Sequence, residues 1–317
     1  MFKVIISGSI HQRIISAGQD AARVHSYLYR LLKRQPVQLL PDVSRLRAHP
    51  EEVLNNPSAL YVLDVSPEEA RSIQQSYGVM CLSGERLDVS PLIDINDIHI
   101  SNVKEKLGHG WDTVLDSVEK LPSNALLLTD RYLFAFRHPN AGDGIANIRA
   151  ILDQLLPRQF AGGDYHVTIV FDNMAKHTSY TFNDIALLLE GLKPQLKRNY
   201  PVMMEVLGIT PDCPVYNKLH NRMIISNYYL VEAAHKLAAF NGDRGTARQM
   251  LIPLTLFTES SLNGTSTPPL NAITQTLKTL SDFSKSLSRR FSHDDYLYAV
   301  NGKRMEKCIV LRNRLIK

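Results

Sequence analysis

The chain has 317 residues, of which 44% are hydrophobic and 21% charged, with a net charge of +5. These values are typical of one large or two ordinary globular domains with a sizeable core. No apolar run approaches the roughly 20 residues of a membrane-spanning helix. The three cysteines lie far apart, which argues against a disulfide framework and a structural zinc site. We therefore expect a cytoplasmic protein without metal or cofactor.

The first 90 residues are expected to form a small α/β domain. Its first segment is β-branched and apolar, as in a buried strand, and lacks the charged leader of a signal peptide. Ser66 and Pro67, followed by two acids, mark the start of a helix. Short strand–helix–strand joins predict parallel pairing. The expected elements are a strand at 2–7, a helix at 19–34, a strand at 60–64, a helix at 66–77 and a strand at 79–82.

A second α/β domain is expected over residues 105–317, after a segment at 88–101 that reads as a connector or an edge strand. Apolar runs alternate with amphipathic stretches, and the chain ends in a helix and a hairpin turning at Asn301-Gly302. The expected helices are 111–121, 144–156, 182–198, 231–239 and one beyond the polar loop 260–269; the expected strands are 125–129, 166–171, 202–207, 223–226, 251–257, 296–300 and 305–311.

Positive charge is concentrated at the carboxyl end of the chain. Residues 278–317 contain ten Lys or Arg against four Asp or Glu, so this part carries +6 and the remainder −1. A basic surface of this kind is typical of proteins that bind nucleic acid. The alternative is an ordinary solvated basic face. The candidate nucleic-acid contacts are Lys285, Arg289, Arg290, Lys303 and Arg304.

The sequence lacks the common nucleotide-binding and hydrolase motifs, including GxGxxG, GxxxxGK[ST], GxSxG and HExxH. Asp64 and Asp130 each follow a predicted parallel strand, which is where α/β folds place their sites. The alternative interpretation of Asp64 is a carboxylate that caps the next helix.

The segment LHNRMIISNYY at residues 219–229 carries the strongest chemical signal. His220 and Arg222 stand two residues apart at the start of an apolar strand, so their side chains leave the same face. A histidine beside a fixed guanidinium combines a nucleophile or acid with a phosphate clamp. The alternative is a structural histidine. Tyr228 and Tyr229 could stack bases, but as strand neighbours they are expected to divide between core and surface.

This segment is similar to the HxKx4D motif of the phospholipase D-like superfamily, and the predicted element order over residues 120–260 agrees with one half-domain of that family. The resemblance implies that His220 is a nucleophile forming a phosphohistidine, that Arg222 replaces the phosphate-binding lysine and that Asn227 stands where an aspartate orients the histidine. It also implies a polar phosphate ligand after the motif, for which Asn241 is the nearby candidate. The family includes lipases, nucleases and non-catalytic relatives.

Two departures from the family pattern shape the functional hypotheses. An asparagine in place of the aspartate removes a carboxylate partner and lowers the basicity of histidine, and only one motif is present. Family chemistry needs two histidines, so an active enzyme would be a homodimer with its site on the two-fold axis. We expect a metal-independent phosphodiesterase of the nuclease class, in which the small domain would regulate, recruit or sense. The alternatives are a catalytically inactive module that binds nucleic acid or a phosphorylated ligand, and a purely structural protein.

Overall fold

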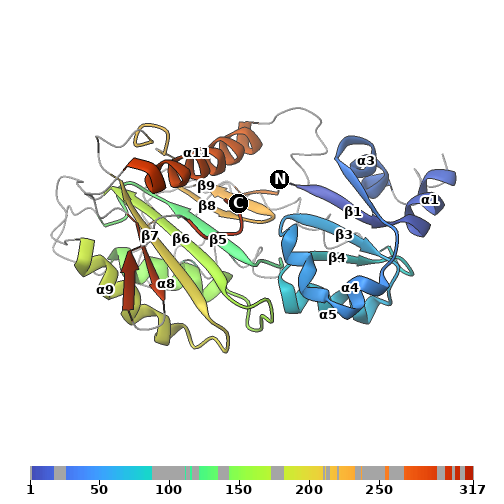
Figure 1. The fold of residues 1–317 in the computed structure, drawn as a ribbon, viewed down its shortest axis with the longest axis horizontal. Helices are drawn as coiled ribbons and strands as arrows, with labels where there is room; N and C mark the ends of the chain where they lie inside the picture. The colour runs from blue at the N-terminus through green and yellow to red at the C-terminus, as the bar shows by residue number, and fades with distance from the viewer. Residues whose placement is uncertain are drawn as a thin grey trace, which may run out of the picture.

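A computed structural model shows an α/β protein built on two separate sheets (Figure 1). The structure describes residues 2–17, 26–87, 111, 115, 121–134, 143–172, 182–209, 211, 215–219, 221–232, 237, 254–256, 268–290, 297–301, 304–307 and 311–316. The smaller sheet lies within residues 3–83 and the larger one within residues 125–307.

The smaller sheet has four parallel strands in the order β2-β1-β3-β4. Strands β1 and β3 are buried on both faces, which explains their unbroken apolar sequence. The chain moves outward from β1 to β2 and then crosses to β3, so the strand order reverses between β1 and β3. The strands are β1 (Lys3–Ser7), β2 (Val37–Leu40), β3 (Ala59–Leu63) and β4 (Met80–Ser83).

Helices cover both faces of the smaller sheet. On one face α1 (Gly8–Ser16) and α3 (Ser26–Arg34) pack against Val4, Ile6 and Val62. The other face packs against α4 (Ser44–Ala48), η1 (Pro50–Asn55) and α5 (Pro67–Tyr77). Helix α5 begins as predicted, because the Ser66 hydroxyl accepts the backbone N–H of Glu69.

The larger sheet has eight strands in the order β10-β9-β8-β5-β6-β7-β11-β12. Its central strands β5, β6 and β7 are parallel, whereas β8, β9 and the terminal hairpin β11–β12 are antiparallel to their neighbours. The strands are β5 (Ala125–Thr129), β6 (Tyr165–Asp172), β7 (Val202–Ile209), β8 (Met223–Ser226), β9 (Tyr229–Glu232), β10 (Leu254–Leu256), β11 (Leu297–Asn301) and β12 (Arg304–Lys307).

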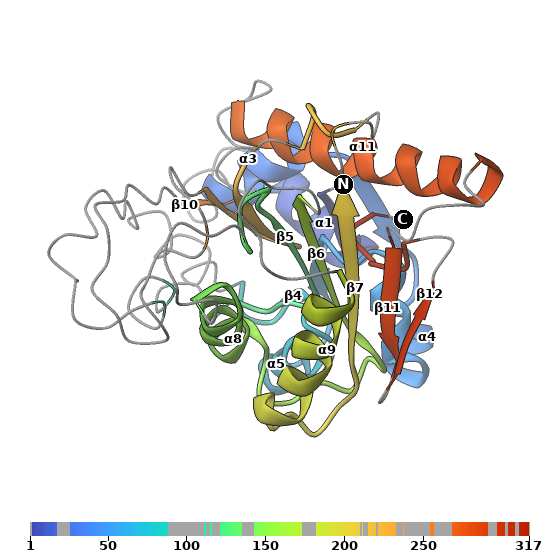
Figure 2. The ribbon, with the colours of Figure 1, turned by 90° about the vertical axis from the view of Figure 1, so that its left-hand side faces the viewer.

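The larger sheet lies between two helical layers (Figures 1 and 2). Helices α8 (Asp143–Leu155) and α9 (Phe182–Leu192) cover one face, where the core is continuous with that of the smaller sheet. Helix α11 (Pro268–Arg290) covers the other face together with residues 311–316. The side chains of β5 alternate between these two cores, with Leu126 and Leu128 on one side and Leu127 on the other.

The two sheets meet through their amino edges, and a set of buried hydrogen bonds joins them. The Asn227 amide donates to the carbonyls of Pro57 (2.7 Å) and Gly78 (3.0 Å) and accepts the backbone N–H of Asn124 (3.2 Å). The Tyr228 hydroxyl accepts the N–H of Met80 at 2.8 Å. The carboxyl edges of the two parallel strand sets consequently face away from each other (Figure 1).

The structure corrects several sequence expectations. Residues 231–232 end strand β9 rather than beginning a helix, because residues 223–232 form a hairpin in which Ile224 pairs with Val231. Tyr228 and Tyr229 are both buried instead of dividing between core and surface. Asn301 pairs with Arg304, so it belongs to the strand and not to the turn. Helix α1 and strand β2 were not predicted.

The predicted helix 182–198 changes character at its end. The α-helix stops at Leu192 and continues as the 3-10 turn η3 (Lys193–Leu196), because Pro194 has no N–H to donate. The predicted segment 88–101 and the loop 260–267 lie outside the described residues, and so does most of 111–121. No helix in the described part of the chain combines the length and hydropathy needed to cross a membrane.

Candidate active site

The candidate site lies at the carboxyl edge of the central strands of the larger sheet. Strand β8 runs antiparallel to β5, and Met223 pairs with Thr129. The residue before Met223 therefore lies at the same edge as the residue after Thr129. This register brings Arg222 beside Asp130, with 3.7 Å between the Arg222 Nε and an Asp130 carboxylate oxygen. The Thr129 hydroxyl donates to the Asn221 carbonyl at 2.8 Å and extends this pairing.

Asp130 is the buried anchor of the site, with no exposed surface. Its carboxylate accepts the backbone N–H groups of Tyr132 and Leu237 and faces the Arg222 guanidinium. A carboxylate held by two backbone donors is fixed in position, so it fixes the arginine in turn. The Arg222 side chain is 24% exposed and packs over the Tyr132 ring, 5.5 Å from its centroid.

A second arginine reaches the same edge one residue after Asp130. The Arg131 guanidinium stacks on the Tyr216 ring at 3.5 Å and lies 3.9 Å from Asp172 at the end of β6. The Tyr216 hydroxyl donates to the same Asp172 carboxylate. Burial, followed by this hydrogen bond, raises the pKa of Tyr216, so its hydroxyl stays protonated as a donor.

The two guanidinium groups converge on one aromatic ring, because Arg131 lies 5.9 Å from the centroid of Tyr132. The Arg131 guanidinium has five N–H donors, and its contact with the Asp172 carboxylate engages only part of them. The Arg131 Nε–H is buried and has no acceptor within the described part of the chain. Two oriented guanidiniums form the kind of fork that binds the oxygens of a phosphate group.

The residues predicted for catalysis lie at different places in the structure, and two of them are not described. Arg222 lies at the carboxyl edge, as its position before an apolar strand predicts. His220 and Asn241 lie outside the described residues. Asn227 follows the other end of β8, roughly 16 Å from Arg222 at about 3.3 Å per residue. Its amide is occupied by the junction between the sheets, so we replace the predicted orienting role by a structural one.

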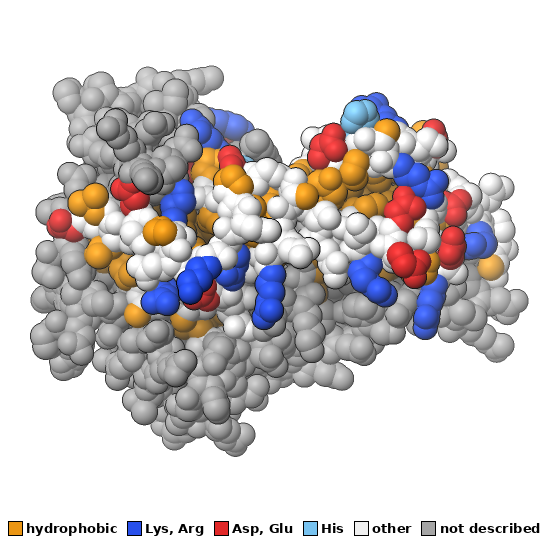
Figure 3. Space-filling view, turned by 90° about the horizontal axis from the view of Figure 1, so that it is seen from below, with side chains coloured by type: hydrophobic (Ala, Val, Ile, Leu, Met, Phe, Trp, Pro, Cys, Tyr) orange, Lys and Arg blue, Asp and Glu red, His pale blue; other side chains and the backbone are white. Residues whose placement is uncertain are grey.

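The predicted nucleic-acid contacts are only partly described. Lys285 is exposed on α11 and lines a cleft at the junction of the sheets. Arg289 and Arg290 belong to the same helix and Arg304 begins β12, but their side chains lie outside what the structure describes, as does Lys303. On the face seen in Figure 3, basic and acidic side chains are interspersed over the smaller lobe, which is the smaller sheet with its helices, residues 2–87. The pairs Arg45–Glu52 and Arg47–Glu69 belong to that lobe.

Sequence reasoning missed Arg131 and its partners. The signal was present for Asp130, which was singled out because it follows a parallel strand. Arg131 is adjacent to it in sequence, but nothing local indicates that Asp172 and Tyr216 would hold its guanidinium. These contacts depend on the pairing of β5 with β6 and on the segment before β8, which brings Tyr216 to the end of β6.

The carboxyl edge of the smaller sheet has a separate polar cluster. The Ser9 hydroxyl donates to the Asp64 carboxylate at 2.9 Å, and the Asp64 N–H donates to the Ser7 hydroxyl at 3.0 Å. Asp64 therefore ties β3 to the start of α1 and does not cap α5, which Ser66 caps instead. The interpretation of Asp64 as a helix cap is wrong.

Among the described residues, no group of three or more His, Cys, Asp and Glu side chains is arranged to hold a metal ion. No protein-family model matches the chain, and no curated protein is similar to it at a significant level.

Proposed function

We propose that the protein is a metal-independent phosphodiesterase, with a nucleic-acid strand as its substrate. The observation that carries this proposal is the convergence of Arg222 and Arg131 on Tyr132 at the carboxyl edge of the larger sheet. His220 stands two residues before Arg222 in the chain. A histidine two residues from Arg222 in the sequence supplies the kind of nucleophile that attacks a phosphodiester held by two arginines.

In the proposed mechanism, a ring nitrogen of His220 attacks phosphorus while the guanidiniums of Arg222 and Arg131 stabilise the charge on the non-bridging oxygens. The bond from phosphorus to the leaving oxygen breaks, and His220 of the partner subunit gives that oxygen its proton. Water then attacks the phosphohistidine, its proton passes to the partner's His220, and the P–N bond breaks. The reaction therefore needs two copies of the chain around a two-fold axis.

A second candidate function is a binding module without turnover. It is favoured by the side chains that could otherwise orient a histidine. Asp130 and Asp172 form ion pairs with Arg222 and Arg131, and the Asn227 amide binds backbone groups at the junction of the sheets. In this alternative the clamp holds a phosphate of nucleic acid or of a phosphorylated ligand, and no residue activates His220.

The first test measures hydrolysis of single- and double-stranded DNA, RNA and a chromogenic phosphodiester in EDTA. We expect turnover by the wild type and none by His220→Ala. Arg222→Ala is expected to lower kcat by about 10²- to 10³-fold, the usual effect of removing one transition-state donor. Arg222→Lys keeps the positive charge but loses the planar guanidinium. Its kcat should therefore lie between that of the wild type and that of Arg222→Ala.

The matched control is Arg71→Ala, which removes an exposed arginine from α5 on the other sheet and should leave the rate unchanged. Turnover by His220→Ala equal to that of the wild type would contradict the covalent mechanism. Phosphate-dependent binding of the substrates that is lost in Arg222→Ala, with no turnover by any variant, would favour the binding module.

A further inference from the structure

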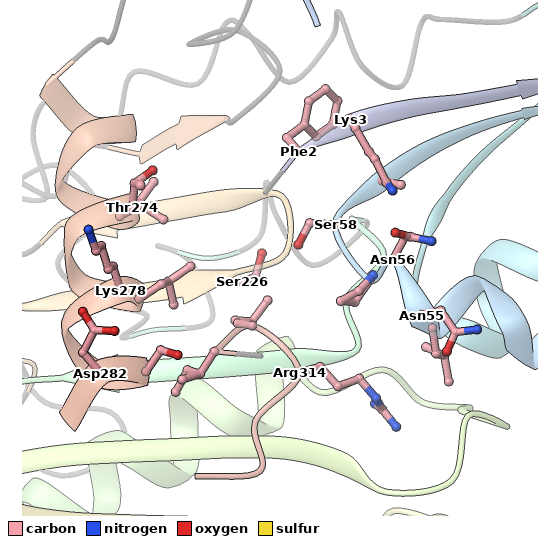
Figure 4. Close-up of a pocket in the computed structure, with 18 of the residues that line it drawn as sticks. Phe2, Lys3, Asn55, Asn56, Ser58, Ser226, Thr274, Lys278, Asp282 and Arg314 are labelled. Atoms are coloured by element: carbon pink, nitrogen blue, oxygen red, sulfur yellow. The ribbon is translucent and has the colours of Figure 1, made fainter. Parts of the chain in front are cut away.

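A cleft of about 830 Å³ lies where the two sheets meet, and the proposed phosphodiesterase site does not use it. One wall is helix α11 and the other is the amino edge of the smaller sheet with residues 54–59; Ser226 and residues 314–316 lie between them. Figure 4 shows Thr274, Lys278 and Asp282 on the side of α11, with Phe2, Lys3 and Asn56 on the opposite side.

The charge of this cleft is predominantly positive. Among the described residues that line it, four side chains are cationic, namely Lys3, Lys278, Lys285 and Arg314, and one, Asp282, is a carboxylate. Among the described ion pairs, none involves Lys3, Lys278 or Arg314.

Two of these cations donate hydrogen bonds to neutral groups, and the Asp164 carboxylate also acts on Arg314 and partly offsets its charge. Lys3 donates to the side-chain oxygen of Gln38 at 2.8 Å. The Arg314 guanidinium donates to the carbonyl oxygens of Asn124 and Gly162 at 3.1 and 2.8 Å. Because the described lining has more cations than carboxylates, and the amide partner of Lys3 carries no charge, the cleft attracts an anion.

The remaining lining indicates a ligand with more than a phosphate group. Side-chain amides and hydroxyls from Asn55, Asn56, Ser58 and Ser281 alternate with apolar surface from Leu277 and Ile316. The volume falls within the roughly 300 to 1,000 Å³ typical of sites for small organic ligands and cofactors. Inorganic phosphate would leave most of this volume empty.

We propose that this cleft binds a phosphorylated organic molecule of nucleotide size. The cleft is distinct from the candidate active site, because Ser226 ends β8 at the cleft whereas Arg222 precedes β8 at the other end. The proposal therefore does not depend on the proposed phosphodiesterase activity. It places a separate ligand where the two sheets meet.

The test is isothermal titration of the full chain at low salt with ATP, AMP, adenosine and inorganic phosphate. We expect saturable binding of ATP and AMP that is tighter than that of adenosine or phosphate. Lys278→Glu reverses an exposed charge on the cleft wall and should weaken binding about tenfold or more. Arg71→Glu, an equal charge reversal on exposed α5 surface outside the cleft, should have no such effect.

A second pair of variants tests whether the ligand occupies the cleft, because it changes the free volume of the cleft and leaves its charge unchanged. Thr274→Trp fills the cleft from α11 and should abolish binding, whereas Gln275→Trp, exposed on the same helix outside the lining, should not. The proposal is overturned if neither ATP nor AMP binds saturably at millimolar concentration, or if only inorganic phosphate binds. Equal weakening by Lys278→Glu and Arg71→Glu, or unchanged binding by Thr274→Trp, also overturns it.

Discussion

The Asn227 side chain is buried where the two sheets meet. Its carboxamide donates two hydrogen bonds and accepts one, all to backbone groups at the junction of the sheets. Both donors face carbonyl oxygens, so only a group with two N–H bonds fits there. An aspartate at this position would point its charge at the carbonyls of Pro57 and Gly78.

We therefore predict that Asn227→Asp lowers the free energy of unfolding by about 3 kcal/mol, the cost of leaving buried polar groups unpaired. Urea unfolding at neutral pH measures this effect. Asn221→Asp makes the same chemical change at an exposed position and should shift stability by less than about 0.5 kcal/mol. A stable, more active Asn227→Asp protein would instead restore the orienting role expected from the sequence.

Glu205 is a second buried side chain with a structural task. Its carboxylate accepts the backbone N–H groups of Arg312 and Asn313 and the hydroxyl of Thr168 at 2.9 Å, and so fastens the carboxyl-terminal segment to β7. Burial raises the pKa of Glu205 above its ordinary value of 4.5, although these three donors lower it in part.

A raised pKa in the folded state means that folding favours the protonated carboxyl. Its contribution to stability is complete below pH 4.5 and is lost as pH rises through the folded-state pKa. We predict that the stability of the wild type, relative to Glu205→Gln, falls between pH 4.5 and pH 8. Urea unfolding across this range measures the difference, with Glu68→Gln, an exposed position, as the control. A difference independent of pH would contradict this account.

At the scale of elements, helix α5 shows how local signals and tertiary contact combine. Ser66 and Pro67 begin it, and Gly78 ends it in the left-handed conformation with φ of 61°. Gly78 also lies against the residues just before β5, where an added Cβ would be 2.0 Å from the Ser123 carbonyl oxygen. Gly78 is thus required twice, once by the helix end and once by the close approach of the two lobes.

We predict that Gly78→Ala destabilises the protein by more than about 2 kcal/mol, because the left-handed conformation alone costs an alanine about 1–2 kcal/mol. Gly191→Ala is the matched control, since Gly191 lies within α9 and nothing occupies the space of an added Cβ. There, alanine should stabilise by roughly 0.5–1 kcal/mol. Thermal unfolding of both variants separates these effects, and equal melting temperatures would contradict the role assigned to Gly78.

At the scale of the whole molecule, the two sheets meet by their amino edges, so their carboxyl edges lie at opposite ends (Figure 1). In open α/β sheets, ligands bind outside the carboxyl ends of the strands. The carboxyl edge of the larger sheet therefore lies on the side away from the smaller sheet, where the proposed dimer would place its two-fold axis.

If the proposed mechanism holds, the active protein is a dimer with two copies of His220 at one centre. We predict that light scattering at micromolar concentration gives a mass twice the 35.8 kDa of one chain. Activity should fall on dilution below the dissociation constant of the dimer. A monomer with full activity would contradict the two-fold site and would require both catalytic groups to come from one chain.

Local sequence patterns predict most of the helices and strands and place Arg222 just before an apolar strand. The apolar run ALLLT predicted β5, Ser66 and Pro67 predicted the start of α5, and the position of Arg222 before an apolar strand predicted that it lies at a strand end. These features depend on neighbours along the chain, and local patterns carry that information.

Tertiary structure decided the rest, because those features depend on contacts between residues far apart in sequence. Residues 231 and 232 belong to a strand because β9 pairs with β8 and β10, although their local pattern predicted the start of a helix. Arg131 joins Arg222 only when β5 pairs with β6 and β8. The Asn227 amide binds at the junction because Pro57, Gly78 and Asn124 place backbone groups there. These partners are far from Asn227 in sequence, so the residues next to it could not predict these hydrogen bonds.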